Sequence, residues 1–301
     1  MSNLVTPPRG PARAVLVTGA TSGIGLATAL RLAERGDRVF AGVRTPAQVP
    51  ALQREHPRLT PLVLDVRDEA SRAAAIANLS DALAGQPLTG LVNNAGIAVQ
   101  GPLEVVPLAE LVHQFEVNLF GLAGLVQRAL PLLRAASRAG HRVTIVNVGS
   151  IGGRLPIPFN GPYNASKFAL VGYTGSLRQE LRPWGIRVAL VEPGTTRTAI
   201  WTKVEQSVDR SQGPGGGLYH AMLDRYRDSV RALQRGGIPA GRVAAVIDGL
   251  LRARWPAHRS LVGDARLLAL LTWLPTVARD ALMARALGLP GRAALLAEVA
   301  R

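Results

Sequence analysis

Short apolar runs alternate along the chain with longer segments in which apolar residues recur at helical spacing. Each run is apolar at consecutive positions, as in a strand that is covered on both faces. The runs are Ala14–Val17, Val39–Val43, Thr60–Leu64, Leu88–Val92, Val143–Asn147, Val188–Val191 and Ser260–Val262. The helical segments include Ile24–Arg35, Leu108–Ala136 and Ser166–Leu181, with breaks at Gly36, Gly140 and Pro183. This alternation predicts an α/β fold, a Rossmann-type doubly wound parallel sheet of about seven strands with helices on both faces.

The same pattern predicts one domain over residues 13–301, preceded by a disordered tail at 1–12. The pattern loosens from about 198 to about 239, where Gly213–Gly217 is typical of a hinge or loop tip. We expect this segment to form a substrate lid, with side chains that suit either a lipophilic substrate or core packing: Trp201, Leu218, Tyr219 and Met222.

Residues 264–301 are expected to form an apolar helical extension. Within it, Leu267–Ala278 is too short to span a bilayer and is interrupted by Pro275. We favour a core or lid helix over an interfacial membrane anchor, but both classes share this pattern. We therefore expect no transmembrane segment, and peripheral membrane contact stays open.

Composition narrows the partner classes. The formal net charge is +15, yet the arginines are scattered, so we expect no nucleic-acid partner and only a general attraction for an anionic cofactor. The chain has no cysteine, which excludes disulfides, thiolate catalysis and cysteine-ligated zinc. No metal site is expected, because the histidines are dispersed: His56, His113, His141, His220 and His258. The first residues lack a secretory pattern, and we expect a cytoplasmic location.

A glycine turn follows the first predicted strand. In Thr18–Gly25, Gly19 permits a tight turn, Gly23 lets the backbone approach a pyrophosphate, and Gly25 allows close packing of helix on sheet. The helical pattern starts at once, so free N–H groups and a positive dipole end face the same place. The order of strand, turn and helix predicts a dinucleotide site.

The second predicted strand ends at Val43, where many such folds carry an acid that binds the ribose 2′-hydroxyl. Here Arg44 follows instead, and its guanidinium suits a 2′-phosphate. NADP is therefore favoured, with NAD as the alternative cofactor. The alternative for Arg44 itself is an ordinary solvent-exposed arginine with no role in cofactor binding. Asp65 and Val66, after the third strand, are candidates for the adenine edge.

The chemistry is expected at Tyr163 and Lys167, whose i,i+4 spacing places phenol and ammonium on one helix face. A nearby ammonium and an oxidised nicotinamide both stabilise a phenolate, which makes the tyrosine an acid/base candidate. Ser150 follows the fifth strand, at the sheet edge where ligands bind, and its hydroxyl is placed to orient a substrate oxygen.

Together these motifs resemble the compact, single-domain short-chain dehydrogenases/reductases. The resemblance spans about Ala14 to Val262 and rests on joint order and spacing. Its motifs are Thr18–Gly25 (TGxxxGIG), Asp65, Asn93–Gly96 (NNAG), Asn118, Ser150, Tyr163-x3-Lys167 and Pro193-Gly194.

The resemblance implies roles for further residues. Asn118 would hold a water in a proton relay from the lysine. Asn93–Gly96 would stabilise the sheet beside the adenosine ribose, and Pro193-Gly194 with Thr196 and Thr198 would bind the nicotinamide and phosphates. Ser22 departs from NADP-using relatives that carry a basic residue there, which leaves Arg44 as the evident 2′-phosphate ligand.

The full expected cofactor set contains the glycine turn, the strand-end residues and the two active-site residues. It is Thr18, Gly19, Ser22, Gly23, Ile24, Gly25, Arg44, Asp65, Val66, Asn93, Ala95, Gly96, Tyr163, Lys167, Pro193, Gly194, Thr196 and Thr198. The expected catalytic residues are Asn118, Ser150, Tyr163 and Lys167.

The segments Tyr163–Leu181 and Val188–Thr198 are most similar to the hydroxysteroid and retinol dehydrogenase branch, which implies a lipophilic alcohol or carbonyl substrate. Relatives also form homodimers or homotetramers, so an oligomer is expected. The alternative is a non-catalytic nucleotide-binding or redox-sensing protein on the same fold.

Overall fold

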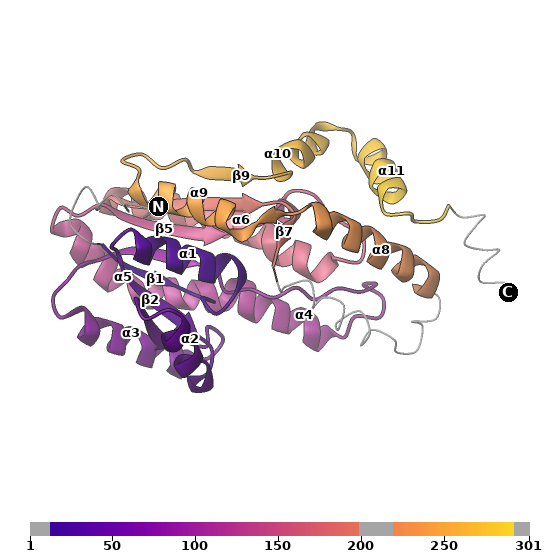
Figure 1. Ribbon diagram of the computed structural model, residues 1–301. Coiled ribbons are helices and arrows are strands. Elements are labelled where there is room, and N and C mark those ends of the chain that lie inside the picture. Colours follow the sequence, from indigo (N-terminus) through magenta and orange to yellow (C-terminus); the bar gives the residue numbers. More distant parts are fainter. Residues whose placement is uncertain (1–12, 199–218, 292–301) are drawn as a thin grey trace, which may run out of the picture.

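The computed structural model describes residues 13–198 and 219–291, and its centre is a sheet of seven parallel strands (Figure 1). The order across the sheet is β3-β2-β1-β4-β5-β6-β9, in which the chain reverses direction of travel between β1 and β4. The strands are β1 (Ala14–Val17), β2 (Arg38–Val43), β3 (Leu59–Val63), β4 (Leu88–Asn93), β5 (Val143–Val148), β6 (Ile186–Pro193) and β9 (Arg259–Val262). The predicted fold class and all seven strands are confirmed.

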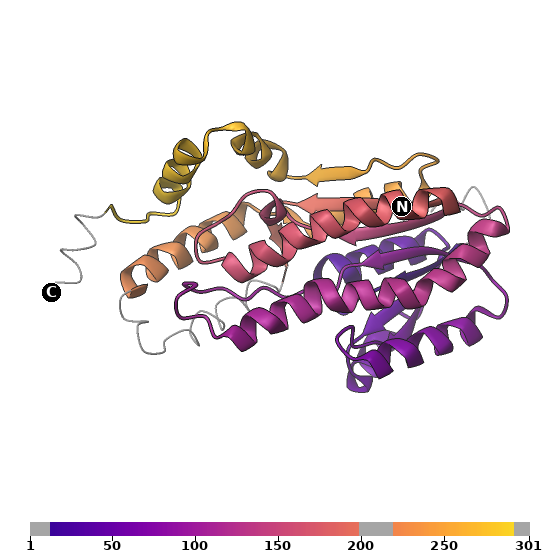
Figure 2. The same cartoon turned by 180° about the vertical axis from the view of Figure 1, so that it is seen from behind.

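Helices cover both faces because each strand is apolar on both. On β1, Ala14 and Leu16 pack on one face, whereas Val15 and Val17 pack on the other. The first face is covered by α3 (Glu69–Leu83), α5 (Gly121–Arg138) and α6 (Gly161–Leu181), which Figure 2 shows in front. The second is covered by α1 (Gly23–Glu34), α2 (Val49–Glu55) and α9 (Ala240–Arg252).

Two predicted helix boundaries change. Helix α6 begins at Gly161 rather than Ser166, because Pro162 occupies the first turn, where a missing N–H is tolerated. The long helix predicted from Leu108 is confirmed as α4 (Leu108–Phe115) and α5, but a π-helical turn, Glu116–Phe120, joins them. That turn contains Asn118, and such turns are frequent at functional sites.

The run from Leu108 to Arg138 is the one candidate membrane span among the described residues, by length and a mean hydropathy of 1.2. Its apolar stripe is accounted for by the core, because Leu122, Leu125, Val126 and Leu133 are buried against the sheet. A core helix of this kind meets the same length and hydropathy criteria, so the run gives no argument for a membrane span.

The remaining elements lie beyond the carboxyl ends of the strands. They are a two-stranded pair, β7 (Thr196–Arg197) and β8 (Ile238–Pro239), then α8 (His220–Gly236), α10 (Ala265–Leu268), a 3₁₀ segment (Ala269–Trp273) and α11 (Thr276–Ala286). The expected tail at 1–12, the glycine run Gly213–Gly217, and Trp201 and Leu218 lie outside the described residues.

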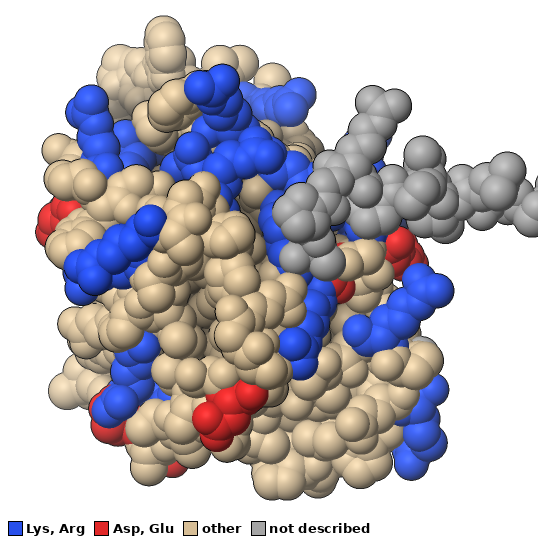
Figure 3. Space-filling view, turned by 90° about the vertical axis from the view of Figure 1, so that its left-hand side faces the viewer, with Lys and Arg blue, Asp and Glu red and all other residues tan. Residues whose placement is uncertain are grey.

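The opposite edge of the sheet, seen in Figure 3, is rich in arginine. Asp248 on α9 accepts from Arg31, Arg35 and Arg252, and its side chain is 3% exposed. Arg252 also forms an ion pair with Asp37, directly before β2. This network therefore ties α1, α9 and the sheet together.

We expect Asp248→Asn to lower the free energy of unfolding by about 1–3 kcal/mol, because it leaves three cations close together around a neutral group. The arginines are partly exposed, which keeps the effect below that of a fully buried pair. Urea unfolding followed by circular dichroism measures it. Glu69→Gln is the matched control, since Glu69 also pairs two arginines but is exposed, and it should leave the midpoint unchanged. Equal midpoints for both variants would contradict the argument.

Candidate active site

A cavity of about 830 Å³ lies at the carboxyl edge of the sheet. Strands β1, β4, β5 and β6 all end there, at the reversal of strand order where α/β sheets bind ligands. Most predicted site residues line this cavity: Gly19, Ser22, Gly23, Ile24, Arg44, Asp65, Val66, Ala95, Gly96, Ser150, Tyr163, Lys167, Pro193, Gly194, Thr196 and Thr198. Thr18, Gly25, Asn93 and Asn118 lie behind it.

The glycine turn is built so that only glycine fits at two of its positions. Gly19 has φ +62°, and a Cβ there would lie 2.9 Å from the Cα of Ala95. A Cβ on Gly25 would lie 2.2 Å from the carbonyl oxygen of Gly19. The first turn of α1 therefore packs directly on the end of β1, as the spacing predicts.

Hydrogen bonds hold this turn against β4. The Thr18 hydroxyl oxygen accepts from the backbone N–H groups of Asn94 and Ala95, both at 2.9 Å. In return, the Asn94 side chain donates to the carbonyls of Thr18 and Gly19. Thr18 is only 1% exposed, so its role is to hold the glycine turn in position and not to contact a ligand directly.

A dinucleotide fits this arrangement. Helix α1 has no acidic residue in its first turn, and its N-cap Ser22 makes no side-chain cap hydrogen bond. The first N–H groups of α1 and the turn around Gly23 therefore face the cavity with the positive end of the helix dipole, as a pyrophosphate requires.

The adenosine end of the cavity carries two arginines. Arg44 lines it as predicted, and Arg67, which the sequence did not single out, lines it too. The Arg67 guanidinium donates to Asp65 at 2.6 and 3.0 Å, and this hydrogen bond holds the pKa of Asp65 below its usual range. Asp65 is therefore a carboxylate already paired with a cation.

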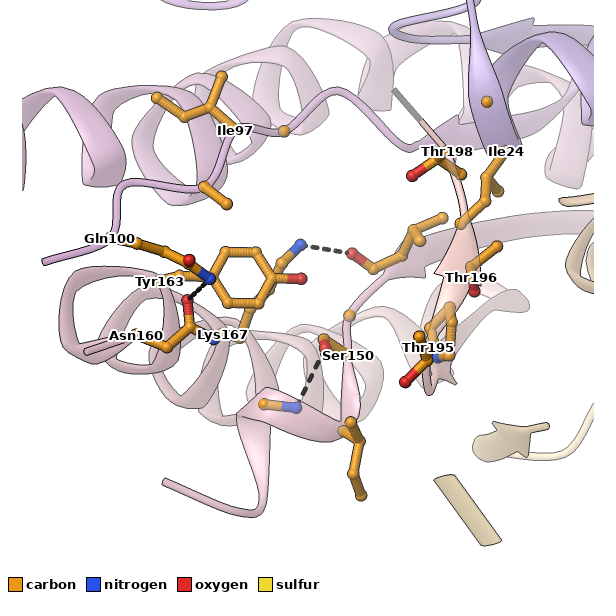
Figure 4. Close-up of a pocket in the computed structure, with 18 of the residues that line it drawn as sticks. Ile24, Ile97, Gln100, Ser150, Asn160, Tyr163, Lys167, Thr195, Thr196 and Thr198 are labelled. Atoms are coloured by element: carbon orange, nitrogen blue, oxygen red, sulfur yellow. Dashed lines mark hydrogen bonds between the residues drawn. The ribbon is translucent and has the colours of Figure 1, made fainter. Parts of the chain in front are cut away.

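Ser150, Tyr163 and Lys167 come together where β5 ends and α6 begins (Figure 4). The Tyr163 hydroxyl is hydrogen-bonded to Ser150, whose Oγ also accepts from the Gly152 N–H at 3.0 Å. Lys167 is buried, donates to the carbonyl oxygen of Val148 at 2.9 Å, and has its Nζ 5.6 Å from the centre of the Tyr163 ring. The three groups meet on one wall of the cavity.

Burial changes both titrations in this trio. It raises the pKa of Tyr163 above its usual range, and the hydrogen bond with Ser150 acts in the opposite direction. It lowers the pKa of Lys167 to about 8. Tyr163 is therefore a protonated phenol at neutral pH, and Lys167 is a cation that loses its charge in mildly alkaline solution.

The loop that carries Ser150 is anchored from below. Arg154, just after it, donates to both carboxylate oxygens of Glu192 at 2.8 and 2.7 Å. Glu192 is fully buried on β6 and also pairs Arg259 on β9. The two guanidinium groups lower the pKa of this carboxyl despite its burial. These ion pairs thus fix the loop after β5, which carries Ser150, to strands β6 and β9.

Asn118 and Asn93 are buried in networks. Asn118 accepts from the N–H of Ile97 at 2.9 Å and donates to Ser166 on α6 at 3.1 Å. Asn93 donates to Asn147 on the neighbouring strand at 2.8 Å. Asn93 therefore ties two strands together, and Asn118 ties the chain after β4 to the helix that carries Tyr163.

The far half of the cavity was not predicted in detail. Gln100 and Asn160 line it and are joined by a hydrogen bond at 2.9 Å (Figure 4). Its other wall comes from α8 and the C-terminal segments and is largely apolar: Tyr226, Val230, Leu268, Leu271, Leu282, Met283, Ala286 and Leu287. No motif marks these positions. The predicted lid at about 198–239 contains Tyr226 and Val230, and the predicted apolar extension at 264–301 contains the other residues of this wall.

Comparison with known proteins agrees with the geometry. Residues 13–209 match the family model of short chain dehydrogenases. The chain is 32% identical to an NADPH-dependent 3-dehydrocapnine reductase from Ornithobacterium rhinotracheale, over 85% of this chain and 90% of the relative. It is 34% identical to human retinol dehydrogenase 16, over 89% and 87%.

Among solved structures, a short chain dehydrogenase from Burkholderia cenocepacia in complex with NADP is similar, with a TM-score of 0.68, 27% identity, and coverage of 91% of this chain and 97% of that one. The matched span contains β1 to β7 and every predicted site residue. The protein belongs to the short chain dehydrogenase family of oxidoreductases.

Proposed function

We propose that this oxidoreductase uses NADP(H) to interconvert a lipophilic alcohol and the corresponding ketone or aldehyde. The observation that carries the proposal is the placement of Tyr163 with Ser150 and Lys167 on one wall of a cavity that has a phosphate-binding turn at one end and an apolar pocket at the other. NADPH bound at the turn and a carbonyl substrate bound in the apolar half of the cavity would then both lie next to the Tyr163 hydroxyl.

In this proposal the bound cofactor supplies the hydride, and the side chains handle the proton. Ser150 orients the substrate oxygen, and the Tyr163 hydroxyl gives that oxygen its proton during reduction. The Lys167 ammonium stabilises the phenolate that remains. Asn118 is proposed to complete the relay from the lysine; its side-chain bonds to Ile97 and Ser166 support a fixed position for it.

NADP rather than NAD is supported by Arg44 and by the pairing of Asp65 with Arg67. Among the described residues that line the cavity, this pairing leaves no carboxylate without a cation to repel a 2′-phosphate. The NADPH-dependent relative and the NADP complex agree with this choice. We expect Arg44→Ser to weaken NADPH binding by about 10- to 100-fold, the usual range for a charged hydrogen bond to phosphate. NADH affinity, measured in parallel by fluorescence titration, should stay unchanged; an equal loss for both cofactors would contradict this role.

A lipophilic substrate is supported by the apolar wall of the far half of the cavity and by the similarity to a retinol dehydrogenase. The test is NADPH consumption with steroids, retinoids, long-chain ketones and small polar ketones at equal concentration. We expect kcat/KM to rise with the apolar length of the substrate. Turnover of the polar ketones alone would contradict the substrate class, and NADPH binding without turnover of any compound would favour a nucleotide sensor.

The lowered pKa of Lys167 predicts a pH dependence. Below about pH 8 the lysine is protonated, and as pH rises through 8 it loses the charge that stabilises the Tyr163 phenolate. Because the pKa of Tyr163 is raised, the phenol itself stays protonated over this interval. The kcat/KM for reduction should therefore fall above about pH 8, and Lys167→Arg, which keeps its charge, should move that fall upward. An unchanged profile in the variant would assign the fall to another group.

A homodimer or homotetramer in the cytoplasm is also part of the proposal. Apolar side chains are exposed on the neighbouring helices α4, the π-helical turn and α6, namely Leu108, Val112, Phe120 and Phe168. Such a face supports association between two copies. Light scattering of the purified chain measures the mass.

A further inference from the structure

The C-terminal helices carry an exposed apolar surface that the reaction does not use. We call it the apolar ridge and define it as Leu267, Leu270, Trp273, Leu274 and Val277, which are 71%, 59%, 88%, 37% and 83% exposed. These residues lie after the edge strand β9, in the span 267–277, on α10, the 3₁₀ segment and the start of α11. Soluble proteins rarely expose large apolar side chains together in this way unless the surface binds something.

The other side of the same segment faces the cavity. Leu268 and Leu271 line the cavity from between the ridge positions. Leu282 and Met283 line it from α11, and Leu287 lines it from the position directly after that helix. Ala265 and Ala269 are buried against Ile151, directly after Ser150. The segment therefore has cavity-lining side chains and the exposed side chains of the apolar ridge at alternating positions, and it separates the apolar half of the cavity from solvent. Figures 1 and 2 show where α10 and α11 follow β9 in the fold.

The charge around the ridge is positive. The two acidic side chains near the ridge already have partners. Asp264 accepts a hydrogen bond from the Thr195 N–H at 2.8 Å, and Asp280 forms an ion pair with Arg279. Arg266 and Arg285 have no acidic partner among the described residues. An apolar strip accompanied in the sequence by arginines whose charge no described carboxylate balances matches the surface of an anionic bilayer, in which acyl chains lie beneath negative headgroups.

A second copy of the chain fits this surface less well. In a two-fold contact each ridge would meet its own image, so Arg266 and Arg285 would approach the same residues of the partner. Like charges brought together across an interface destabilise it. A tryptophan at the most exposed position is, in contrast, the residue that favours the boundary between headgroups and acyl chains.

We propose that the apolar ridge docks the protein on the surface of anionic membranes, with Trp273 inserted at the headgroup level. The contact is peripheral, through side chains of short helices that lie along the surface. The docked wall places the apolar half of the cavity next to the acyl chains, which would let a lipophilic substrate enter from the membrane; this last clause rests on the proposed function, whereas the docking does not.

The test uses the full chain, NADPH and vesicles of phosphatidylcholine with or without phosphatidylglycerol, in a flotation assay. We expect binding to the anionic vesicles, weakening as salt is raised because the arginine contribution is screened. Trp273→Gln/Val277→Gln should lower the partition coefficient by about tenfold or more, since two apolar side chains no longer leave water. Trp255→Gln/Val63→Gln, which removes an exposed tryptophan and an exposed valine outside the ridge and outside the proposed contact between copies, is the matched control and should bind as the unchanged protein does.

Trp273 also reports its own insertion. Lipids brominated on the acyl chain should quench the tryptophan fluorescence of the unchanged protein on anionic vesicles, and Trp273→Phe should remove most of that quenching. Three outcomes overturn the proposal: no binding to anionic vesicles, equal binding of the two double variants, or a ridge variant that instead turns a dimer into a monomer in light scattering. None of these readouts depends on turnover, so they fail separately from the proposed reaction.

Discussion

Tyr163→Phe is expected to lower kcat for both directions of the reaction by about 10³-fold or more, while NADPH still binds. The variant removes one oxygen atom, the phenol oxygen of Tyr163 that lies beside Ser150 on the cavity wall (Figure 4). General acid–base catalysis contributes about 10²- to 10⁴-fold, and loss of the phenol also removes the group that Lys167 polarises. The phenylalanine ring fills the same space, so the cavity keeps its shape. Stopped-flow hydride transfer and fluorescence titration of NADPH measure the two effects separately.

Tyr173→Phe is the matched control, because Tyr173 lies on the same helix, α6, and is partly buried where that helix packs against the core. It should retain normal kcat and normal NADPH affinity. A Tyr163→Phe variant with more than a tenth of normal activity would contradict the assignment of the proton donor. Loss of NADPH binding in that variant would instead make the ring a structural part of the cofactor site.

The fold was predictable because the central strands are buried on both faces and are apolar at most consecutive positions. Phe40 and Val39 on β2 go to opposite cores, and the sequence shows both as apolar. Boundaries were harder to predict. Strand β6 extends two residues beyond its predicted start and two beyond its predicted end because Ile186 and Glu192 are buried, the latter by pairing with two arginines that come from other segments.

The cofactor half of the cavity was predictable because its residues fall in short motifs at the ends of successive strands, some of them constrained by the backbone. Gly19 and Gly25 leave no room for a side chain, so their spacing is visible in the sequence. The substrate half is assembled from residues more than a hundred positions apart, such as Gln100 and Tyr226, and only tertiary packing brings them together. Arg67 escaped notice for a related reason, since its pairing with Asp65 is a local side-chain contact without a motif.

Gly25→Ala is expected to weaken NADPH binding strongly while the protein still folds. The added Cβ would lie 2.2 Å from the Gly19 carbonyl oxygen and 2.4 Å from the Asn94 side-chain nitrogen, so the start of α1 must move away from the turn. Overpacking of this kind costs about 1–3 kcal/mol in stability. The N–H groups that face the phosphates move with the helix, and we expect NADPH affinity to fall by about 100-fold.

Gly175→Ala on α6 is the matched control, because a Cβ there meets nothing within 4 Å. It should leave NADPH affinity unchanged and raise the free energy of unfolding by up to about 1 kcal/mol, the difference between glycine and alanine in a helix. NADPH titration and urea unfolding of both variants decide the matter. If Gly25→Ala binds NADPH as tightly as Gly175→Ala does, then the turn after β1 does not hold the phosphates. Only Arg44 and the position of the cavity at the carboxyl edge of the sheet would then support a dinucleotide in this cavity.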